Sequence, residues 1–381
     1  MVSHPFVKRL IHSTKVSGGA VVSKFLRSLF LREQGSAARL RQAFVQPQHW
    51  EGCSVQKLLP AVDSPTVEPK FFVSNLRTQA YLELLKNGET TTSTAGIVAL
   101  NEVNVLLPTG LHLWQGKVFS DLLIGTELLI NPKYVLQLES IPFQKKHEAP
   151  EAVLLTLPWN HNFFHWMIEI LPRLVLYDMA KELHHLKLIV PKSSSKFVKD
   201  SLRITGYSDR VSFLEDGVYR FEKLHGLSRL AKTSYVSSYA VEWWNQKVPP
   251  VPAAPSRRIY VSRADSKIRY LTNEREVETL LAKFGFETVV MSQYSLEEQI
   301  RMFQQSAVVI GAHGSAFTHT AFMAPGTRFI EFFEDGHFNR CFHRIASLKG
   351  LQYGFLVGQK QGFGFAIDLA QLQELLKQVL D

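Results

Sequence analysis

Short apolar runs alternate with segments of helical periodicity along the C-terminal part of the chain. In the segment 273–284, Val277, Leu280, Leu281 and Phe284 fall on one face of a helix. The predicted strands are 258–261, 288–291, 307–310, 328–332 and 353–357, and the predicted helices are 273–284, 296–304, 315–323 and 370–380. Such alternation is typical of the α/β class, in which helices connect the strands of a parallel sheet.

The first two thirds of the chain are less regular. The pattern predicts strands at 97–107, 111–114, 122–130, 152–157, 186–190 and 211–214. It predicts helices at 78–86, at 161–182 with a bend or restart at Pro172, and at 194–204. Four prolines within 247–255 predict a stiff, extended linker. We therefore expect a strand-rich domain at 46–247, a linker at 248–256 and a second domain at 257–381, as two Rossmann-like domains that face each other across a cleft.

Residues 1–45 form a basic arm with an amphipathic stretch. Its apolar residues have the spacing of one helical face: Val21, Val22, Phe25, Leu26, Leu29 and Phe30. Three interpretations stay open, namely a helix on an anionic membrane surface, a helix packed on the body of the protein, and an organelle transit peptide. A secretory signal is not favoured, because charges interrupt every candidate apolar core.

Composition restricts the class of protein. The chain has 381 residues, of which 45% are hydrophobic and 20% charged, as expected of a globular protein with about two domains. Its two cysteines are far apart, which argues against a disulfide scaffold. Eight basic residues and one acidic residue lie in the arm, so the body is nearly neutral despite a net charge of +9. A nucleic-acid-coating body is therefore not favoured, and no apolar run is long enough to predict a membrane-spanning helix.

A glycine-rich turn gives the strongest local signal. The run Val308-Val-Ile-Gly-Ala-His-Gly-Ser-Ala-Phe-Thr takes a buried strand directly into a helix. Small residues at Gly314 and Ser315 let backbone N–H groups approach an anion at the helix start, with His313 beside them. An ordinary strand-to-helix turn is the alternative. The run is neither a dinucleotide fingerprint nor a phosphate-binding loop of NTPases.

Three further residues belong to the same predicted sheet edge. Arg263 follows the strand 258–261 and Arg269 lies in the next loop, and guanidinium groups suit phosphate oxygens. Glu331 ends an apolar strand, where it could accept both hydroxyls of a ribose or could be a paired surface glutamate. Asn273 with Glu276 is interpreted as a capping box. Together these residues outline a nucleoside-diphosphate site.

A second candidate site lies in the N-terminal half. His161, His165 and Glu169 are spaced four residues apart, so they can share one helix face. A carboxylate one turn from an imidazole can orient it as a general base, although such a pair is often only structural. A zinc site is a rival interpretation, but the spacing is not diagnostic. His184, His185, His337 and His343 are interpreted as solvated or structural.

In this order, the motifs resemble glycosyltransferase family 61, which includes plant xylan arabinosyl- and xylosyltransferases and animal protein O-GlcNAc transferases. The matching pieces are Asn162-Phe-Phe-His-Trp with Leu171-Pro-Arg-Leu, then Tyr260-Val-Ser-Arg with Arg269 and Asn273-Glu274, then Gly311-Ala-His-Gly-Ser-Ala-Phe-Thr with Ile330-Glu331. The resemblance implies a GT-B fold, a nucleotide-sugar donor, inversion at the anomeric carbon and no required metal or cofactor. Ser315 and Ala316 depart from the Ala-Gly usual in the family loop, and His319 departs from its asparagine.

The resemblance, together with these motifs, implies an inverting, metal-independent glycosyltransferase, with a nucleotide-sugar donor and a glycan or other hydroxyl acceptor, in polysaccharide biosynthesis. His165 and Glu169 are the predicted catalytic residues of the acceptor-side domain. Arg263, Arg269, His313, Gly314, Ser315 and Glu331 are the predicted donor-binding residues. The alternatives are a non-catalytic nucleotide-sugar or carbohydrate-binding protein of the same fold, a nucleotide-sugar epimerase and, more remotely, a metallohydrolase. The expected location is cytoplasmic, with the arm as a candidate for peripheral contact with the inner face of an anionic membrane.

Overall fold

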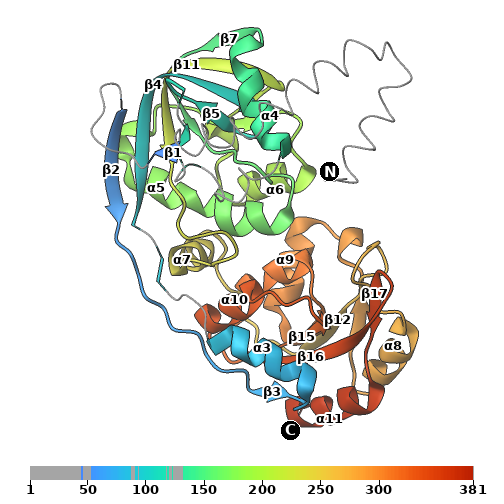
Figure 1. The fold of residues 1–381 in the computed structure, drawn as a ribbon. Coiled ribbons are helices and arrows are strands. Elements are labelled where there is room, and N and C mark those ends of the chain that lie inside the picture. Colours follow the sequence, from blue (N-terminus) through green and yellow to red (C-terminus); the bar gives the residue numbers. More distant parts are fainter. Residues whose placement is uncertain are drawn as a thin grey trace, which may run out of the picture.

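The computed structural model describes residues 44–45, 53–86, 91–92, 94–116, 118–119, 122 and 132–380. The amphipathic stretch of the predicted arm and nearly all of the predicted strand 122–130 lie outside these residues. The last two residues of the arm form β1 (Phe44–Val45), which pairs in parallel with β6 (Val118–Phe119). The described chain is an α/β protein with mixed sheets, so the predicted α/β class is confirmed (Figure 1).

Five parallel strands form the centre of the C-terminal sheet. They are β12 (Arg257–Val261), β13 (Glu287–Val289), β14 (Ser306–Ala312), β15 (Arg328–Glu334) and β16 (Gln352–Gln361), in the spatial order β13-β12-β14-β15-β16. β17 (Gly364–Ala366) returns antiparallel to the end of β16. The central strands are apolar on both faces, as expected where helices cover both sides. The strand order reverses between β12 and β14, and at such a point a doubly wound sheet opens a crevice at its carboxyl edge.

The helices of this half are α8 (Glu274–Ala282), α9 (Leu296–Gln304), α10 (Cys341–Lys349), α11 (Leu369–Leu380) and two 3₁₀ helices, Met291–Gln293 and Ser315–Phe322. The predicted helices and strands of this half are confirmed with small shifts at their ends, but the sequence did not predict α10. The predicted capping box of Asn273 is wrong. Its amide makes no cap bond and instead pairs with the backbone N–H and carbonyl of Ile367, at 3.1 and 2.8 Å. The chain has a capping box at the start of α9, between Ser295 and Glu298.

The N-terminal sheet is mixed. Its strands are β2 (Cys53–Leu59), β4 (Ala95–Leu107), β5 (Leu111–Leu113), β7 (Lys146–Ala149), β8 (Ala152–Leu154), β9 (Leu188–Pro191), β10 (Val211–Leu214) and β11 (Gly217–Leu227). The main order is β10-β9-β8-β11-β4-β2. β10, β9, β8 and β11 pair in parallel in that order, and β7 also pairs in parallel with β11. In this Rossmann-like part, α6 (Lys196–Ile204) lies between β9 and β10. β4 is antiparallel to both β11 and β2.

Several helical segments complete this half. α4 (Pro132–Ser140) lies beside β5, and α7 (Ser238–Lys247) ends at the predicted linker. The predicted helix 161–182 is confirmed as a π-helical turn, His165–Ile170, a 3₁₀ turn, Leu171–Arg173, and α5 (Leu174–Met179). The restart falls at Pro172, which has no backbone N–H to continue the helix. Residues 248–256 contain no helix or strand and join α7 to β12.

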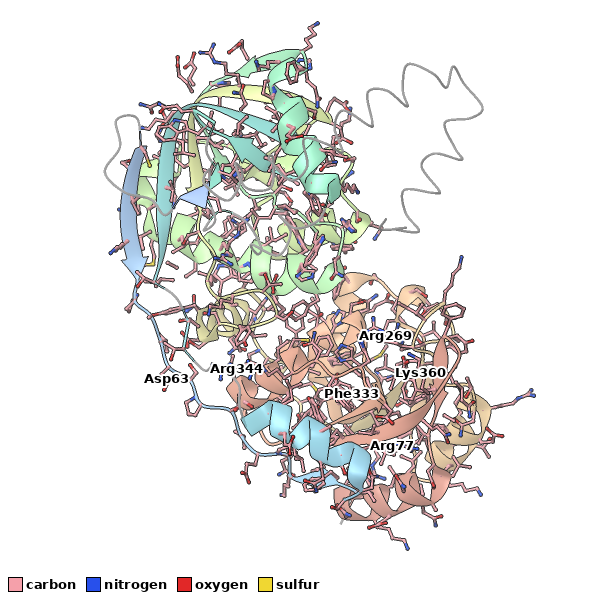
Figure 2. The ribbon with its side chains drawn as sticks, in the orientation of Figure 1. Asp63, Arg77, Arg269, Phe333, Arg344 and Lys360 are labelled. Carbon is pink, nitrogen blue, oxygen red and sulfur yellow. The ribbon has the colours of Figure 1, made fainter. Side chains whose placement is uncertain are left out.

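Residues 60–86, which we call the strap, run from the N-terminal sheet to the C-terminal one (Figure 1). Within the strap, β3 (Phe71–Phe72) pairs in parallel with β16, and α3 (Leu76–Lys86) lies over the same sheet. Arg77 of α3 pairs with Asp335 at 3.1 Å, and Arg344 of α10 donates to the Ser64 carbonyl (Figure 2). The predicted helix 78–86 is therefore confirmed, but it packs on the C-terminal sheet, although the predicted boundary assigns it to the N-terminal domain.

The two halves meet through α6 on α9 and through α7 on α10 and the 3₁₀ helix. His319 lies in this contact, with its ring 4.9 Å from that of Phe163 and 5.2 Å from that of Phe303. Its Nδ1 is 2.9 Å from the Ala316 carbonyl, and within the described part of the chain its buried Nε2 has no partner. Burial lowers the pKa of His319 to about 4.

We expect stability to fall as the pH falls from about 6.5 to 4. Burial also lowers the pKa of His112 and of His343 to about 4. Between these pH values the three histidines bind protons in the unfolded chain but stay neutral in the folded chain. Each of them then lowers the free energy of unfolding by up to about 3 kcal/mol. Urea unfolding at pH 7 and pH 4.5 measures the loss. His319→Phe should reduce the difference between the two pH values, and an unchanged difference would contradict this assignment.

Candidate functional site

Arg263 and Gly314 lie at the switch point of the C-terminal sheet. Arg263 follows β12 and Gly314 follows β14, and these strands are neighbours. A Cβ atom at position 314 would lie 1.8 Å from Nη1 of Arg263, so any larger residue would require the guanidinium to move away from this turn. The sequence predicted both residues at one edge, and the structure brings them into contact.

The guanidinium of Arg263 is only partly satisfied. Its Nη2 donates to the Ser266 hydroxyl at 2.7 Å and to the Ile268 carbonyl at 3.1 Å, while its buried Nε has no partner among the described residues. Burial lowers the pKa of Arg263 to about 10, and the nearby charge of Arg269 adds to this effect. A buried cation with an unpaired donor beside a second arginine is an arrangement that an anion would stabilise.

Glu274 fixes the end of β12, a role that the sequence did not reveal. Its Oε1 accepts from the Tyr260 hydroxyl at 2.8 Å, the Ser262 hydroxyl at 2.9 Å and the Arg263 backbone N–H at 3.3 Å. Burial, followed by the charge of Glu274, raises the pKa of Tyr260. Glu274 therefore holds the backbone from which the Arg263 side chain extends.

Arg269 adopts a left-handed backbone conformation, with φ of +55°, which is uncommon for a residue other than glycine. Its backbone N–H donates to the Phe363 carbonyl at 2.7 Å, and its Nη1 lies 3.0 Å from Nε2 of His337. Burial lowers the pKa of His337, with smaller contributions from Arg269 and His313. His337 is exposed, which agrees with its prediction as solvated or structural, and a neutral ring at this place can accept from Arg269 beside the predicted donor site.

His313 forms a buried pair with Glu331. Nδ1 of His313 lies 2.5 Å from Oε1 of Glu331, and Oε2 of Glu331 accepts from the Tyr353 hydroxyl at 2.8 Å. Glu331 is fully buried, and the His313 side chain is 9% exposed. Because both oxygens of Glu331 are occupied and none reaches solvent, the predicted contact with a ribose does not fit. Glu331 instead orients His313, whose ring packs on Phe333 and Phe342.

The second Glu–His pair is the one predicted on the helix face. Nδ1 of His165 lies 2.6 Å from Oε2 of Glu169, and the Ser234 backbone N–H donates to Oε1 of Glu169 at 2.6 Å. The two side chains are 13% and 11% exposed, and the ring of Trp159 packs on His165. The π-helical turn that begins at His165 widens the helix at this point. His161 is exposed and does not join the pair.

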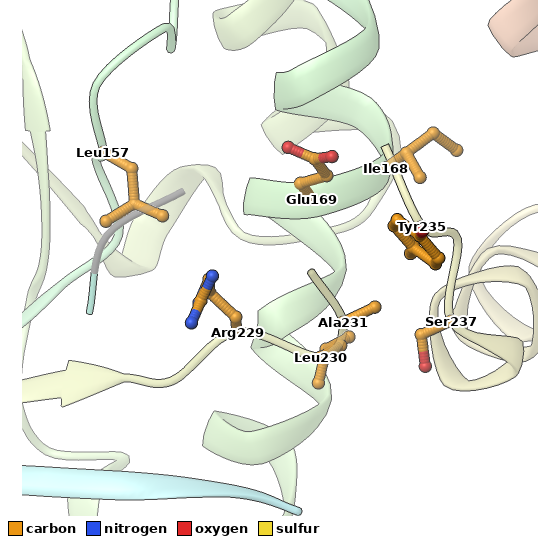
Figure 3. A pocket seen from close by; sticks show the side chains of 8 residues that line it. All are labelled: Leu157, Ile168, Glu169, Arg229, Leu230, Ala231, Tyr235 and Ser237. Carbon is orange, nitrogen blue, oxygen red and sulfur yellow. The ribbon is translucent and has the colours of Figure 1, made fainter. Parts of the chain in front are cut away.

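A small pocket opens beside Glu169 (Figure 3). It is lined by Leu157, Ile168, Glu169, Arg229, Leu230, Ala231, Tyr235 and Ser237. Arg229 comes from the segment after β11, so the pocket lies between the helix and the end of the N-terminal sheet. It places a positively charged and a negatively charged side chain around a space next to the predicted base.

The two Glu–His pairs lie on opposite sides of one aromatic contact. The ring of Phe164, next to His165, lies 5.6 Å from that of Phe342, and the ring of Phe342 lies 5.1 Å from that of His313. The buried thiol of Cys341 has a raised pKa, mainly through burial but also through the charges of Glu331 and Glu169. Both carboxylates therefore act on one thiol at the contact between the two halves.

The loop residues that depart from the family pattern have different environments. Ser315 is exposed at the start of the 3₁₀ helix, whereas Ala316 is half-buried and its carbonyl is occupied by His319. His319 packs toward Phe163 of the other half. These two changes therefore affect the contact between the halves, and Ser315 alone presents a new side chain to solvent at the turn.

Comparison with known proteins agrees with the motif resemblance. Residues 163–330 match the family model described as Glycosyltransferase 61. A beta-1,2-xylosyltransferase of Arabidopsis thaliana is 33% identical over 96 residues, covering 22% of this chain and 18% of the relative. Beta-1,2-xylosyltransferase RCN11 of Oryza sativa subsp. japonica is 30% identical over 91 residues, covering 22% of this chain and 17% of the relative. The chain thus spans less than a fifth of the length of these curated relatives. Residues 163–330, which carry His165, Arg263 and His313, are therefore similar to the glycosyltransferase 61 family.

Proposed function

We propose that this protein is an inverting glycosyltransferase that moves a sugar from a nucleotide-sugar donor to a hydroxyl group of a glycan or other acceptor. The observation that carries the proposal is the pair of Arg263 and Gly314 at the switch point of a parallel sheet, within the family-matched residues. A GT-B arrangement, with the donor on the C-terminal half and the acceptor on the other, fits the two sheets and the irregular connection between them. A role in polysaccharide biosynthesis is part of the proposal.

The donor diphosphate would bind at the edge formed by β12 and β14. Arg263 and Arg269 would contact its oxygens, and the backbone at Gly314 and Ser315 would receive a phosphate at the start of the 3₁₀ helix. The two guanidinium groups would stabilise the charge of the leaving diphosphate, a role that metal ions have in other transferases. His313, held by Glu331 through Nδ1, lies on the same turn, and once Nε2 has bound a proton it would donate a hydrogen bond to that leaving group.

The acceptor hydroxyl would be activated from the N-terminal half. Glu169 accepts from Nδ1 of His165, which leaves Nε2 of the neutral ring to take the hydroxyl proton. The hydroxyl oxygen then bonds to the anomeric carbon as the bond from that carbon to the diphosphate oxygen breaks on the opposite face. After this step the proton resides on His165 and the negative charge on the diphosphate. Because the hydroxyl attacks on the face opposite the leaving group, the configuration at the anomeric carbon is inverted.

Arg263→Ala is expected to weaken donor binding by about tenfold or more, because a charge-assisted hydrogen bond contributes roughly 1.5–3 kcal/mol. A thermal-shift titration with nucleotide sugars measures the affinity, since a bound donor raises the apparent stability. The two plant relatives are named for xylosyl transfer, so xylose nucleotides belong in the panel. Arg257→Ala is the matched control, because Arg257 lies at the other end of β12 and pairs with Glu287 at 2.6 Å. Unchanged affinity in both Arg263→Ala and Arg269→Ala would remove these residues from the donor site.

The alternative is a protein that binds nucleotide sugars without catalysis, and the departure of Ser315 from the family loop leaves this alternative open. The same panel of nucleotide sugars distinguishes it from an enzyme. Such a protein would retain donor affinity but show neither transfer nor donor hydrolysis. Contact of the basic arm with an anionic membrane stays a prediction, because nearly the whole arm lies outside the described residues. A cytoplasmic location also stays a prediction. Within the described part of the chain, no helix has the length and apolar character to span a bilayer.

A further inference from the structure

A chain of buried polar groups continues behind His313. Glu331 binds His313 through Oε1 and the Tyr353 hydroxyl through Oε2, and the Tyr353 hydroxyl lies 3.0 Å from that of Tyr81. Tyr81 and Glu331 are fully buried, and Tyr353 is 3% exposed. No step of the proposed reaction uses the two tyrosines, yet their hydroxyls end at the carboxylate that holds His313.

The hydrogen bonds of this chain have one direction. A tyrosine hydroxyl carries a single proton, and that of Tyr353 is donated to Glu331, so the Tyr353 oxygen accepts from Tyr81. An ionised Glu331 accepts at both oxygens, so the neutral His313 ring carries its proton on Nδ1. Nε2 of His313 is then the atom without a proton, and its state is set by groups in the core.

The strap brings Tyr81 into this chain. Tyr81 lies on α3, where its ring packs on Phe333, Phe338 and Phe355 at centroid distances of 4.5, 5.4 and 4.8 Å. The pairing of β3 with β16 and the Arg77–Asp335 ion pair hold α3 on the C-terminal sheet. A residue from well before the family-matched region thus completes the environment of Glu331, which directly follows that region.

We propose that Tyr353 and Tyr81 are positioning residues for His313, because their directed hydrogen bonds hold Glu331 as an anion in one orientation and so fix the tautomer of His313. This inference rests on the proposed function only for its effect on catalysis. The expected sign follows from charge. The Tyr353 hydroxyl stabilises the Glu331–His313 pair more when the pair is negative than when it has bound a proton. Removing that hydroxyl should therefore make the pair bind its proton at a higher pH.

Other titratable or charged groups around the pair stay in place in such a variant. They are His343 of α10, whose ring lies 4.7 Å from that of Tyr353, Glu334 of β15, His337 and Arg340 of the segment after it, Cys341 of α10, Lys360 of β16, Arg269 of the loop after β12 and Glu169 of the opposite half. A difference between wild type and a tyrosine-to-phenylalanine variant therefore reports on the lost hydroxyl alone.

The test is an NMR titration of His313 in the full-length protein with labelled histidine, in which His313→Gln assigns the signal. Tyr353→Phe should raise the apparent pKa of the pair by about one unit or more, and Tyr81→Phe should raise it by less. Tyr207→Phe is the matched control and should cause no shift, because its buried hydroxyl donates to Asp178 in the other half.

The alkaline limb of the transfer rate, where His313 loses the Nε2 proton that it would donate to the leaving group, should move to higher pH by the same amount in Tyr353→Phe, with little change in KM for the donor. An unshifted titration in a folded Tyr353→Phe protein, or an equal shift in Tyr207→Phe, would overturn the inference. If Tyr353→Phe does not fold, the sign of the shift in Tyr81→Phe decides. Absence of transfer by the wild-type protein would instead reject the proposed function, while the titration would still decide the role of the tyrosines.

Discussion

His165→Ala is expected to lower kcat by a factor of about 10²–10⁴ while donor affinity survives, because general-base catalysis is typically worth that much. His165 has the geometry of a base, with Nδ1 held by Glu169 at 2.6 Å and the side chain 13% exposed. The donor would bind the opposite half, so its affinity should not depend on this ring. Initial rates at saturating donor, together with the thermal-shift affinity, measure the two effects separately.

Two further variants sharpen this test. Glu169→Gln should cause a smaller loss than His165→Ala if Glu169 only orients the ring, and an equal or larger loss if Glu169 is itself the base. His161→Ala is the control, because His161 is exposed one turn earlier and contacts neither member of the pair. Turnover of His165→Ala near the wild-type value would reject His165 and move the search for the base to Glu169.

Arg173→Ala is expected to lower the free energy of unfolding by about 3–5 kcal/mol or more, the largest stability loss that we predict. Arg173 is 1% exposed and donates to three carbonyl groups, those of Ile170 at 3.2 Å, Leu227 at 2.5 Å and Leu155 at 2.6 Å. These carbonyls belong to the π-helical turn and to the ends of β11 and β8. Alanine would leave all three buried acceptors without this donor and would open a cavity.

Burial lowers the pKa of Arg173 to about 9, so the side chain is still charged at pH 7. Arg173→Lys keeps a charge but lacks the planar fork, so we expect an intermediate loss. Urea unfolding compares the variants with Arg220→Ala as a control. The Arg220 side chain is 43% exposed and pairs with Glu102 at 3.1 Å. Loss of that surface pair should lower the free energy of unfolding by less than about 1 kcal/mol. If Arg173→Ala lost as little stability as Arg220→Ala, the three carbonyl groups would have found other partners, and the prediction would be wrong.

The sequence by itself determined the features that depend on neighbours along the chain or on one sheet edge. Helical periodicity predicted the contact of His165 with Glu169, because residues four apart on a helix are always adjacent. Alternation of apolar strands and helices predicted the parallel C-terminal sheet, and the carboxyl ends of adjacent parallel strands share an edge. Arg263 and Gly314 could therefore be placed together although 50 residues separate them.

The tertiary structure decided which side chains reach solvent and which distant segment covers each face. A carboxylate at the end of an apolar strand gives the same sequence pattern whether it faces a ligand or is enclosed. Glu331 is enclosed because the strap adds Tyr81 and β3 to a sheet that begins far later in the chain. Asn273 likewise has the sequence of a helix cap, but the backbone of Ile367 occupies its amide. Periodicity shows that one face of a helix or strand is apolar. It does not show which segment covers that face, because segments far apart in the chain leave no common local pattern in the sequence.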